Sequence, residues 1–555
     1  MNLGILNQEF NPVFRFIATF TGVAILAGCG SSGSGGTAVS SYNMAVKMTD
    51  ASGCDYNNIV VTVGQVALNT RLNASKDDLD WTFVTLNPPV TIDLLQLQNG
   101  DTLSFANLNI PAGTYKSILL TLVPNSTSSS TYNDYVTLLD SPKQQIPLLF
   151  SPGFPNKISI NFNKPVTISS DGTISNIVID FDACHSVVTS TDTLGNILYF
   201  LKPKLMEINE DHSGGIVGTI ITASSSSTAP QHLVVKAEIK GQDGNYYVVR
   251  QTQPHPDGTF KLYPLEYDDD SKGVYDVVVV SDNYGTLAIQ DVIVPSHHDD
   301  VLLSSTTSAD IGTIKFDTLT KPAVSWSTAG TFTGTITPRG ADVRIRETVG
   351  GRTYQVRRTH SDLQTGIFTF PLSWGQTASE AYSTGTMTFT GDILTSAGSY
   401  TADTPSGDCD NDDRTVLEDQ IFPFQITDGK KALTVIHDFV ITPVNSSGVP
   451  LASLSSSLSG TVMAVNLPAD DIEKVFLIAL INGKFVIGLD EITLTVQTTA
   501  MKYTIDQLPV GAVVNVEAFI ADFEHNSSET ISVQDGSPVT LVNGTNIGPD
   551  FTFTE

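Results

Sequence analysis

Apolar and polar residues alternate in short runs along most of this chain. Because successive side chains of a strand point to opposite faces of a sheet, each run predicts a strand with one buried face. Clusters of Pro, Gly and Asn separate the runs, and such spacing is typical of sandwiches and barrels. The pattern therefore predicts an all-β fold built of tandem β-sandwich domains. The clearest runs in the first part of the chain are 44–48, 59–63, 117–122, 157–161 and 177–181.

One apolar stretch near the start of the chain does not alternate. It holds 11 residues, 16–26, and follows Arg15. It therefore has the length of a signal-peptide core and is too short to span a membrane. It ends in LAGC at 26–29, which resembles the bacterial lipobox, whose Cys thiol is diacylated after the preceding peptide is removed. The resemblance implies a lipoprotein signal peptide at 1–28 and lipidation of Cys29. The alternative is a cytosolic N-terminal helix with a chance Cys.

Residues 29–40 are rich in Gly and Ser and predict a flexible tether between the lipid and the folded part. Several acyl chains on one residue would anchor the protein firmly, because a single chain binds membranes only marginally. No Asp follows Cys29, and by resemblance to enterobacterial sorting rules this indicates the outer membrane or the cell surface. The segment before the apolar stretch departs from the usual signal, since it carries Glu9 and a single basic residue.

The first folded unit is predicted at 41–210. Its landmarks, in order, are VKMTD at 46–50, TIDLL at 91–95, IPAGTY at 110–115, IDFDAC at 179–184 and LKP at 201–203. In this order they resemble the domain-of-unknown-function 4382 family of bacterial lipoproteins. The resemblance implies no activity, because the function of that family is itself unknown.

Beyond this unit the chain predicts three further β-sandwich domains. Their opening strands share a glycine at Gly218, Gly334 and Gly460, and these are spaced 116 and 126 residues apart. Such long spacing indicates domain duplication rather than a solenoid of short units. The predicted boundaries are 213–312, 326–447 and 457–555.

The motifs of these domains resemble a second family. DGTFKL at 257–262 and GVYDVVVV at 273–280 follow the opening strand of the first repeat, and the last repeat has YTIDQLPVG at 503–511. The order resembles the carboxypeptidase regulatory-like, transthyretin-like sandwich, which implies a carbohydrate-binding-like fold. The middle repeat departs from this pattern through its Arg-rich run at 342–347 and a later acidic insertion.

Acidic residues outnumber basic ones, with 58 Asp and Glu against 29 Lys and Arg and a formal charge of −29. This balance excludes nucleic acid as a partner, because phosphate binding needs a basic surface. Charged residues make up only 16% of the chain, so it is not a disordered acidic tail.

Four Cys residues occur, and lipidation of Cys29 leaves Cys54, Cys184 and Cys409. An exported protein meets an oxidising compartment. Because Cys54 and Cys184 lie in one predicted domain, we expect either a disulfide between them or two independent thiols. Cys409 is left over in an acidic loop.

That acidic loop has the spacing of a cation site. Asp408, Asp410 and Asp412 alternate, and Asp419 stands at the twelfth position counted from Asp408. Hard cations need several oxygens converging from a short loop, and this spacing resembles an EF-type calcium loop. Position six is Asp413, where the calcium loop has Gly, and no flanking helices are predicted. The two interpretations are a weak calcium site and a solvated acidic turn.

Asp180, Asp182, Cys184 and His185 bring together the residue types of a cysteine-nucleophile site. Such a Cys needs a His beside its thiol and a third group that orients the His. Alternation along a strand places Asp180 and Asp182 on one face, while His185 follows Cys184 directly and points elsewhere. We therefore expect a structural Cys at a strand end, no catalytic residues, and a protein that is not an enzyme.

Sandwich domains on a lipidated tether favour a membrane-anchored, surface-exposed lipoprotein with a non-enzymatic adhesion, scaffold or envelope-interaction role. The alternative is a carbohydrate-binding lipoprotein of a glycan-utilisation system, in which exposed aromatic rings would stack on sugars. The expected partners are the membrane, through the anchor, and either extracellular polysaccharide or another envelope protein. The aromatic residues considered for such stacking are Trp81, Trp326, Trp374, Tyr246 and Tyr247.

Overall fold

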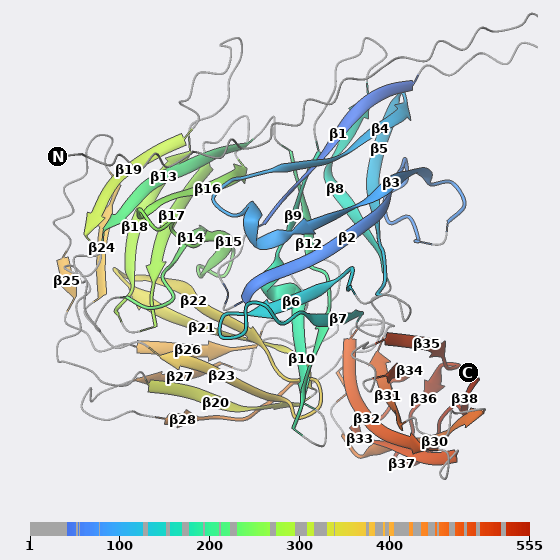
Figure 1. The fold of residues 1–555 in the computed structure, drawn as a ribbon. Helices are drawn as coiled ribbons and strands as arrows, with labels where there is room; N and C mark the ends of the chain where they lie inside the picture. The colour runs from blue at the N-terminus through green and yellow to red at the C-terminus, as the bar shows by residue number, and fades with distance from the viewer. Residues whose placement is uncertain are drawn as a thin grey trace, which may run out of the picture. The chain divides into compact units, whose positions relative to one another are not determined.

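The computed structural model describes most of the chain from residue 41 to residue 554 (Figure 1). Within that range it leaves out 51–53, 55, 77, 126–130, 151–155, 169–176, 192–194, 210–212, 222–229, 267–272, 283, 295–307, 316–329, 338, 373–376, 383–391, 395–398, 405–420, 426–433, 442–449, 452–453, 466–471, 482–484, 496–499 and 523–528. Strands arranged in separate sheets dominate the described residues, which confirms the predicted all-β class and the tandem sandwiches. None of the helices in this part of the chain has the length and hydropathy of a membrane span.

The first domain packs two sheets around one core. A four-stranded sheet has the order β12-β9-β1-β4, and an eight-stranded sheet has the order β10-β11-β7-β6-β2-β5-β8 with β3 paired to β2. The first sheet comprises β1 (Ser41–Thr49), β4 (Leu103–Pro111), β9 (Ile177–Phe181) and β12 (Leu205–Asn209). The second comprises β2 (Tyr56–Asn69), β3 (Thr82–Asp93), β5 (Gly113–Leu122), β6 (Tyr135–Leu138), β7 (Ile146–Phe150), β8 (Lys157–Ile168), β10 (Val187–Thr191) and β11 (Ile197–Leu201). Two short helices, η1 (Leu94–Leu97) and α1 (Ala183–Ser186), join strands.

Alternating side chains build this core. Along β1, Met44, Val46 and Met48 are buried between the two sheets, as the period of two requires. Strand β9 differs because it is buried at every position. Its second face is covered from outside the domain, where Asp180 forms an ion pair with Arg250 of the next domain.

The remaining three sandwiches share one strand topology. In each, the first strand pairs antiparallel with the fourth strand and parallel with the last strands of the domain. The second strand lies between the third and the fifth strands of its sandwich. This count leaves out β24 (Thr377–Ala381) and β25 (Asp392–Leu394), which join the sheet of the second domain. Duplication of one domain would produce this arrangement. Membership of the carboxypeptidase regulatory-like family stays a prediction.

The bounds of these strands follow the chain. The second domain has β13 (Ser213–Ile221), β14 (Val234–Lys240), β15 (Tyr246–Thr252), β16 (Thr259–Glu266), β17 (Gly273–Val280), β18 (Leu287–Val294) and β19 (Ser308–Lys315). The third has β20 (Gly330–Thr337), β21 (Asp342–Val349), β22 (Arg352–His360), β23 (Ile367–Leu372), β24 (Thr377–Ala381), β25 (Asp392–Leu394), β26 (Ser399–Asp403), β27 (Phe422–Gln425), β28 (Thr434–Ile436) and β29 (Phe439–Val440). The fourth has β30 (Ser456–Val465), β31 (Ile472–Ile481), β32 (Phe485–Thr495), β33 (Ala500–Leu508), β34 (Val513–Asp522), β35 (Glu529–Asp535), β36 (Val539–Thr540), β37 (Gly544–Ile547) and β38 (Phe551–Thr554).

The third sandwich contributes a strand to the second. Strand β24 pairs in parallel with β18 and then with β25, which extends the sheet of the second domain to six strands. Ala378 of β24 is fully buried in the core of that domain. The added strand covers the backbone edge that β18 would otherwise expose. The predicted domain boundary at 312 falls inside β19. The segment 377–394 joins the sheet of the second domain, although the sequence placed it in the third. Pairing between distant strands leaves no periodic signal in the sequence, so neither feature could be predicted from it.

Buried contacts join the sandwiches to one another. One apolar cluster combines Leu149, Val188 and Phe200 of the first domain with Phe476, Ile478 and Leu480 of the fourth. Phe200 and Phe476 meet edge to face, with ring centroids 6.4 Å apart. Between the first and second domains, Arg250 NH1 donates to Asp180 at 2.7 Å, and the Arg250 side chain is only 2% exposed.

Candidate functional site

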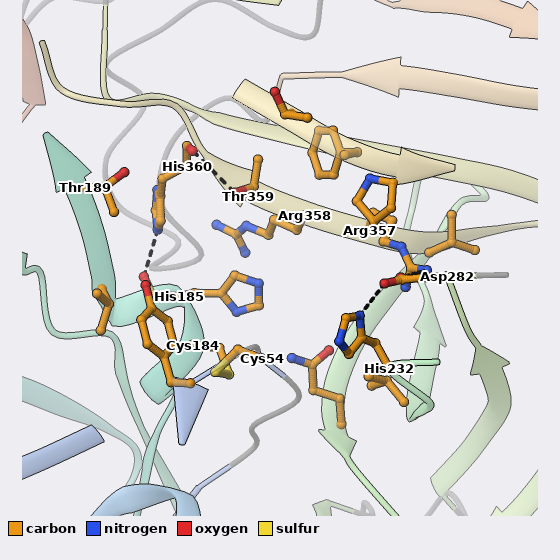
Figure 2. A pocket seen from close by; sticks show the side chains of 18 of the residues that line it. Cys54, Cys184, His185, Thr189, His232, Asp282, Arg357, Arg358, Thr359 and His360 are labelled. Carbon is orange, nitrogen blue, oxygen red and sulfur yellow. Dashed lines mark hydrogen bonds and ion pairs between the residues drawn. A yellow bond between two sulfur atoms is a disulfide. The ribbon is translucent and has the colours of Figure 1, made fainter. Parts of the chain in front are cut away.

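A cavity of about 490 Å³ is lined by residues from the first three domains. The first domain contributes α1, β10 and β11, the second contributes β14 and β15, and the third contributes β22 and β23. Figure 2 shows His185, Arg357, Arg358 and His232 around the same hollow, with the disulfide beside His185. A second cavity of about 470 Å³ adjoins it, since Cys54, Tyr56 and His232 line both.

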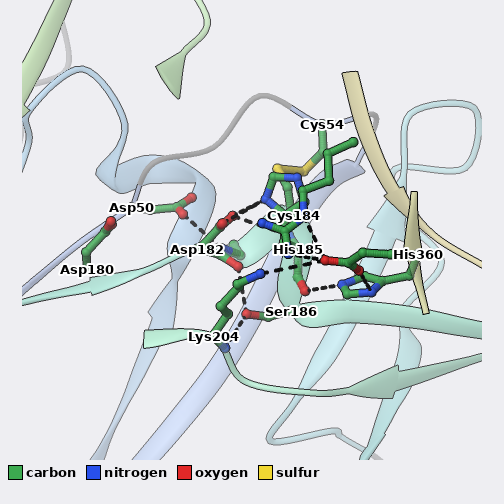
Figure 3. Close-up of polar contacts among 12 residues, drawn as sticks. Asp50, Cys54, Asp180, Asp182, Cys184, His185, Ser186, Lys204 and His360 are labelled. Carbon is green, nitrogen blue, oxygen red and sulfur yellow. Dashed lines mark hydrogen bonds and ion pairs between the residues drawn. A yellow bond between two sulfur atoms is a disulfide. The ribbon is translucent and has the colours of Figure 1, made fainter. Parts of the chain in front are cut away.

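Helix α1 positions the wall that the first domain supplies. It begins directly after β9, where Asp182 acts as N-cap and accepts from the backbone N–H of His185 at 3.3 Å. Ser186 Oγ donates to the Asp182 carbonyl at 2.6 Å, and the N–H of Ala183 donates to the Asp50 carboxylate at 3.0 Å (Figure 3). Burial raises the pKa of Asp50 well above its usual range. These bonds fix the turn that carries Cys184 and His185.

Cys54 and Cys184 are joined by a disulfide, with Cα atoms 5.5 Å apart. Of the two arrangements that the sequence left open, the structure has the pair and not two independent thiols. The bond ties the segment before β2 to α1, and both residues line the cavity. The Cys184 sulfur is therefore not a free nucleophile.

His185 and Asp182 form a close pair at the cavity wall. The His185 Nδ1 lies 2.7 and 2.8 Å from the two Asp182 carboxylate oxygens. Burial lowers the pKa of His185, and Asp182 opposes that effect. Burial also disfavours the charge on Asp182, but His185, Lys204 and Arg358 outweigh it and lower the pKa of Asp182. The arrangement is therefore a neutral imidazole that donates from Nδ1 to a carboxylate.

Strand β22 supplies the opposite wall. Arg358 Nε donates to Asp342 at 2.7 Å, and His360 Nδ1 also contacts this carboxylate. His360 Nε2 donates to the His185 carbonyl at 2.7 Å, which ties the third domain to α1. Burial alone would raise the pKa of Asp342, but Arg358 and His360 hold it well below its usual range.

A second ion pair closes another side of the cavity. Arg357 NH2 donates to the Asp282 carboxylate at 2.7 Å, and the His232 ring contacts the same carboxylate through Nδ1. Figure 2 shows this contact between His232 and Asp282. One carboxylate of the second domain therefore contacts the His232 ring of its own domain and Arg357 of β22 in the third domain.

Lys236 of β14 also lines the cavity and is buried, with 5% of its surface exposed. Its Nζ donates to the backbone carbonyls of Val356 at 2.8 Å and Gln355 at 3.3 Å. Burial lowers the pKa of Lys236 to about 7 and raises that of Glu238, two residues along the same strand, to about 8. Lys236 therefore joins the second and third domains below the cavity.

The structure keeps Asp182, Cys184 and His185 together on the α1 turn and sets Asp180 apart from them. Asp180 faces the second domain and binds Arg250, whereas Asp182 caps α1. The expectation that both aspartates share one strand face is wrong, because β9 ends at Phe181 and the chain turns into a helix. His185 does not point elsewhere either, since that turn brings it back onto Asp182.

Other predicted site residues lie outside the described residues. These are the lipidation site Cys29 and the carboxylates Asp408, Asp410, Asp412 and Asp419. In the part of the chain that the structure describes, no group of three or more His, Cys, Asp or Glu side chains is placed to hold a metal ion.

The described aromatic residues considered for sugar stacking, Trp81, Tyr246 and Tyr247, are engaged in other contacts. Trp81 is buried and donates from its indole nitrogen to the Ser75 carbonyl at 2.8 Å. Tyr246 is buried against Tyr354, and the Arg346 guanidinium lies 4.5 Å from the centroid of the Tyr247 ring. Trp326 and Trp374 are not among the described residues.

Several cavity residues escaped the sequence analysis, among them His232, Gln251 and Arg357. The Arg-rich run at 342–347 was noted, but its neighbour strand β22 carries the two arginines that reach the cavity. No local motif joins these positions, because they come from three domains.

The comparisons identify one domain. Residues 43–203 match the family model described as "Domain of unknown function (DUF4382)", which confirms the resemblance noted for the first domain. No curated protein matches the chain. Among solved structures, the Bacillus anthracis TIE protein is 10% identical, with 94% of this chain and 75% of that chain covered and a TM-score of 0.16. The pilus-presented adhesin Spy0125 (Cpa) is 8% identical, with 61% and 100% covered and a TM-score of 0.12. At these TM-scores neither likeness supports an argument. The comparisons therefore show one domain of unknown function, at 43–203, within an all-β chain.

Proposed function

We propose that this protein is a membrane-anchored, surface-exposed lipoprotein with a non-enzymatic adhesion, scaffold or envelope-interaction role. The observation that carries the proposal is the set of buried contacts between sandwiches. Domains joined by a linker move relative to one another unless their interface is large and apolar. Here an apolar cluster joins the first and fourth domains, and the buried Arg250–Asp180 pair joins the first and second. Such contacts support a scaffold that presents its loops in one arrangement.

The chemistry of the cavity supports a binding role over catalysis. The Cys184 sulfur is held in a disulfide and is therefore not available as a thiolate nucleophile. The His185–Asp182 pair has the form of an oriented base, but nucleophilic catalysis also needs an activated nucleophile beside it. Among the described residues, the Cys beside this pair is not available for that role.

The lipid anchor is tested by replacing Cys29→Ser. This change removes the thiol that the lipobox resemblance assigns to acylation, so we expect the full-length variant to move from the detergent phase to the aqueous phase on Triton X-114 extraction. Intact cells treated with proteinase K should lose the wild-type protein if it faces outward. Unchanged detergent partition of the variant would overturn the anchor, and protection of the wild-type protein would overturn surface exposure.

The second candidate role is carbohydrate binding, and the observation that favours it is the cavity. Its walls combine ring-bearing and hydrogen-bonding side chains, as small-ligand pockets do. The aromatic residues first considered for an open stacking face are buried or covered where they are described, so a pocket suits this role better than a flat surface. A glycan array probed with the full-length chain tests the role, and silence on every glycan would remove polysaccharide as a partner.

A further inference from the structure

We propose that the cavity between α1, β14, β15 and β22 binds a small hydroxylated anion, that is, a sugar acid or a sugar phosphate. The inference deepens the second candidate role by naming its ligand class. Its test is separate from that of the scaffold role, because it measures ligand binding in the cavity and not the distance between domains.

The charged side chains that line the cavity favour an anionic ligand. Among its described residues the guanidiniums of Arg357 and Arg358 stand against the single carboxylate of Asp282. Burial lowers the pKa of Lys236 and of His185, so these two side chains supply hydrogen-bonding groups rather than fixed positive charge. In the whole chain, Asp and Glu outnumber Lys and Arg by 58 to 29. A cleft lined by one sign of charge concentrates ligands of the other sign. The cavity therefore reverses the charge balance of the protein.

Arg357 has donors left for a ligand. Its hydrogen bonds among the described residues go to Asp282 through one terminal nitrogen. A guanidinium carries five N–H donors in a planar fork, which suits the oxygens of a carboxylate or a phosphate. Because Asp282 already fixes the Arg357 guanidinium, this side chain loses little conformational entropy when an anion binds.

Gln251 offers a hydrogen-bonding amide to a ligand in the cavity. It is 7% exposed, lines the cavity and pairs across the sheet with Lys236, so both side chains lie on the same face. Its amide has no hydrogen-bond partner among the described residues, yet its polar atoms are not sealed off from the cavity. Because these atoms face the cavity, a ligand with hydroxyl groups can satisfy both the donors and the acceptor of the amide.

His185 explains why the anion should carry hydroxyl groups. Its Nδ1 donates to Asp182, and its Nε2 has no hydrogen-bond partner in the described part of the chain. In a neutral imidazole that donates from Nδ1, Nε2 is an acceptor. An acceptor suits a ligand O–H and not a bare oxyanion. A volume of about 490 Å³ lies within the range of small-ligand pockets.

Calorimetric titration of the full-length chain tests the inference with matched probes. D-galacturonate is compared with D-galactose, D-glucose 6-phosphate with D-glucose, and inorganic phosphate is the anion without hydroxylated carbon. We expect at least one sugar anion to bind about tenfold more tightly than its neutral counterpart and than inorganic phosphate, since each such factor corresponds to one charge-assisted contact. The preferred probe then identifies the anion as carboxylate or phosphate.

Three results would overturn the inference. Absence of binding by both sugar anions removes the site. Equal binding of neutral sugars removes charge recognition but leaves carbohydrate binding intact. Equal binding of inorganic phosphate shows that hydroxyl groups contribute nothing.

Two variants locate the binding. Gln251→Leu should lower the affinity for the preferred probe about tenfold without lowering the melting temperature, because the amide has no partner to lose. Gln65→Leu is the matched control, since Gln65 bonds Thr85 on the exposed face of the first domain, away from the cavity. Arg357→Gln should remove the preference for anions over neutral sugars. Equal affinities of the Gln251 and Gln65 variants would contradict the assignment even if the Arg357 variant failed to fold.

Discussion

At the scale of single residues, burial decides how the ionisable groups of this protein behave. Asp182, Asp342 and Asp403 are buried with cationic or imidazole partners, and the pKa of the first two is lowered. Asp134 is buried without such a partner. It accepts the Thr62 N–H at 2.9 Å through one oxygen, and its other oxygen has no partner among the described residues. Burial accordingly raises the pKa of Asp134 to about 8.

The raised pKa of Asp134 makes the free energy of unfolding fall as pH rises. The unfolded chain releases the Asp134 proton near pH 3.9, roughly the ordinary value for Asp, whereas the folded chain retains it to about pH 8. The stabilising contribution is complete below the unfolded pKa and is lost as pH rises through the folded pKa. Each unit of difference corresponds to about 1.4 kcal/mol.

We therefore expect Asp134→Asn to remove this slope. Asn keeps the acceptor for Thr62 and carries no charge, so the variant should match the wild type near pH 3.5, below the unfolded pKa, and melt higher than it at pH 8.5. Thermal unfolding followed by circular dichroism at both pH values measures this. Asp140→Asn, at an exposed carboxylate of the same domain, is the control and should show no such crossover. A melting difference that does not change with pH would contradict the account.

At the scale of elements, alternation predicted much of what the structure contains. The runs at 44–48, 59–63 and 117–122 lie within β1, β2 and β5. Alternation failed at the end of β9, where the N-cap bond of Asp182 starts a helix that a period-two reading does not detect. It also gave no sign of β24, because a strand that pairs with β18 of another domain is specified by distant contacts and not by its own five residues.

The Cys54–Cys184 disulfide acts at this scale because it ties α1 to the segment before β2. The two residues are 130 positions apart, and the chain-entropy model assigns about 4–5 kcal/mol to a loop of that size. We expect Cys54→Ser with Cys184→Ser to lower the unfolding midpoint in urea and to weaken ligand binding in the cavity that both residues line. Mass spectrometry of non-reduced peptides checks the bond itself. Two free thiols in the wild type, or an unchanged midpoint in the double variant, would refute the predicted stabilisation.

At the scale of the whole molecule, the candidate site exists because three domains meet. Its polar groups stand at positions as distant as His185, Gln251 and Arg357, and each belongs to a different sandwich. His185 could be singled out from the sequence because Asp182 and Cys184 stand beside it in the chain. Gln251 and Arg357 could not, because each lies in another domain and no local motif links them to His185. Contacts between domains also support the proposed scaffold role. The scaffold role and the binding cavity therefore both require a fixed arrangement of the domains.

The central claim is that buried contacts hold the sandwiches in one arrangement, and a distance measurement between the first and fourth domains tests it most directly. Spin labels at Leu79→Cys and Ile547→Cys occupy exposed sites, with Cys29 and Cys409 replaced by Ser and the native disulfide kept. Phe476→Asp disrupts the apolar cluster between these domains while leaving the separate core of the fourth domain unchanged. Double electron–electron resonance should give one narrow distance distribution for the parent protein and a broad one for the Phe476 variant. A parent distribution as broad as that of the variant would contradict the claim.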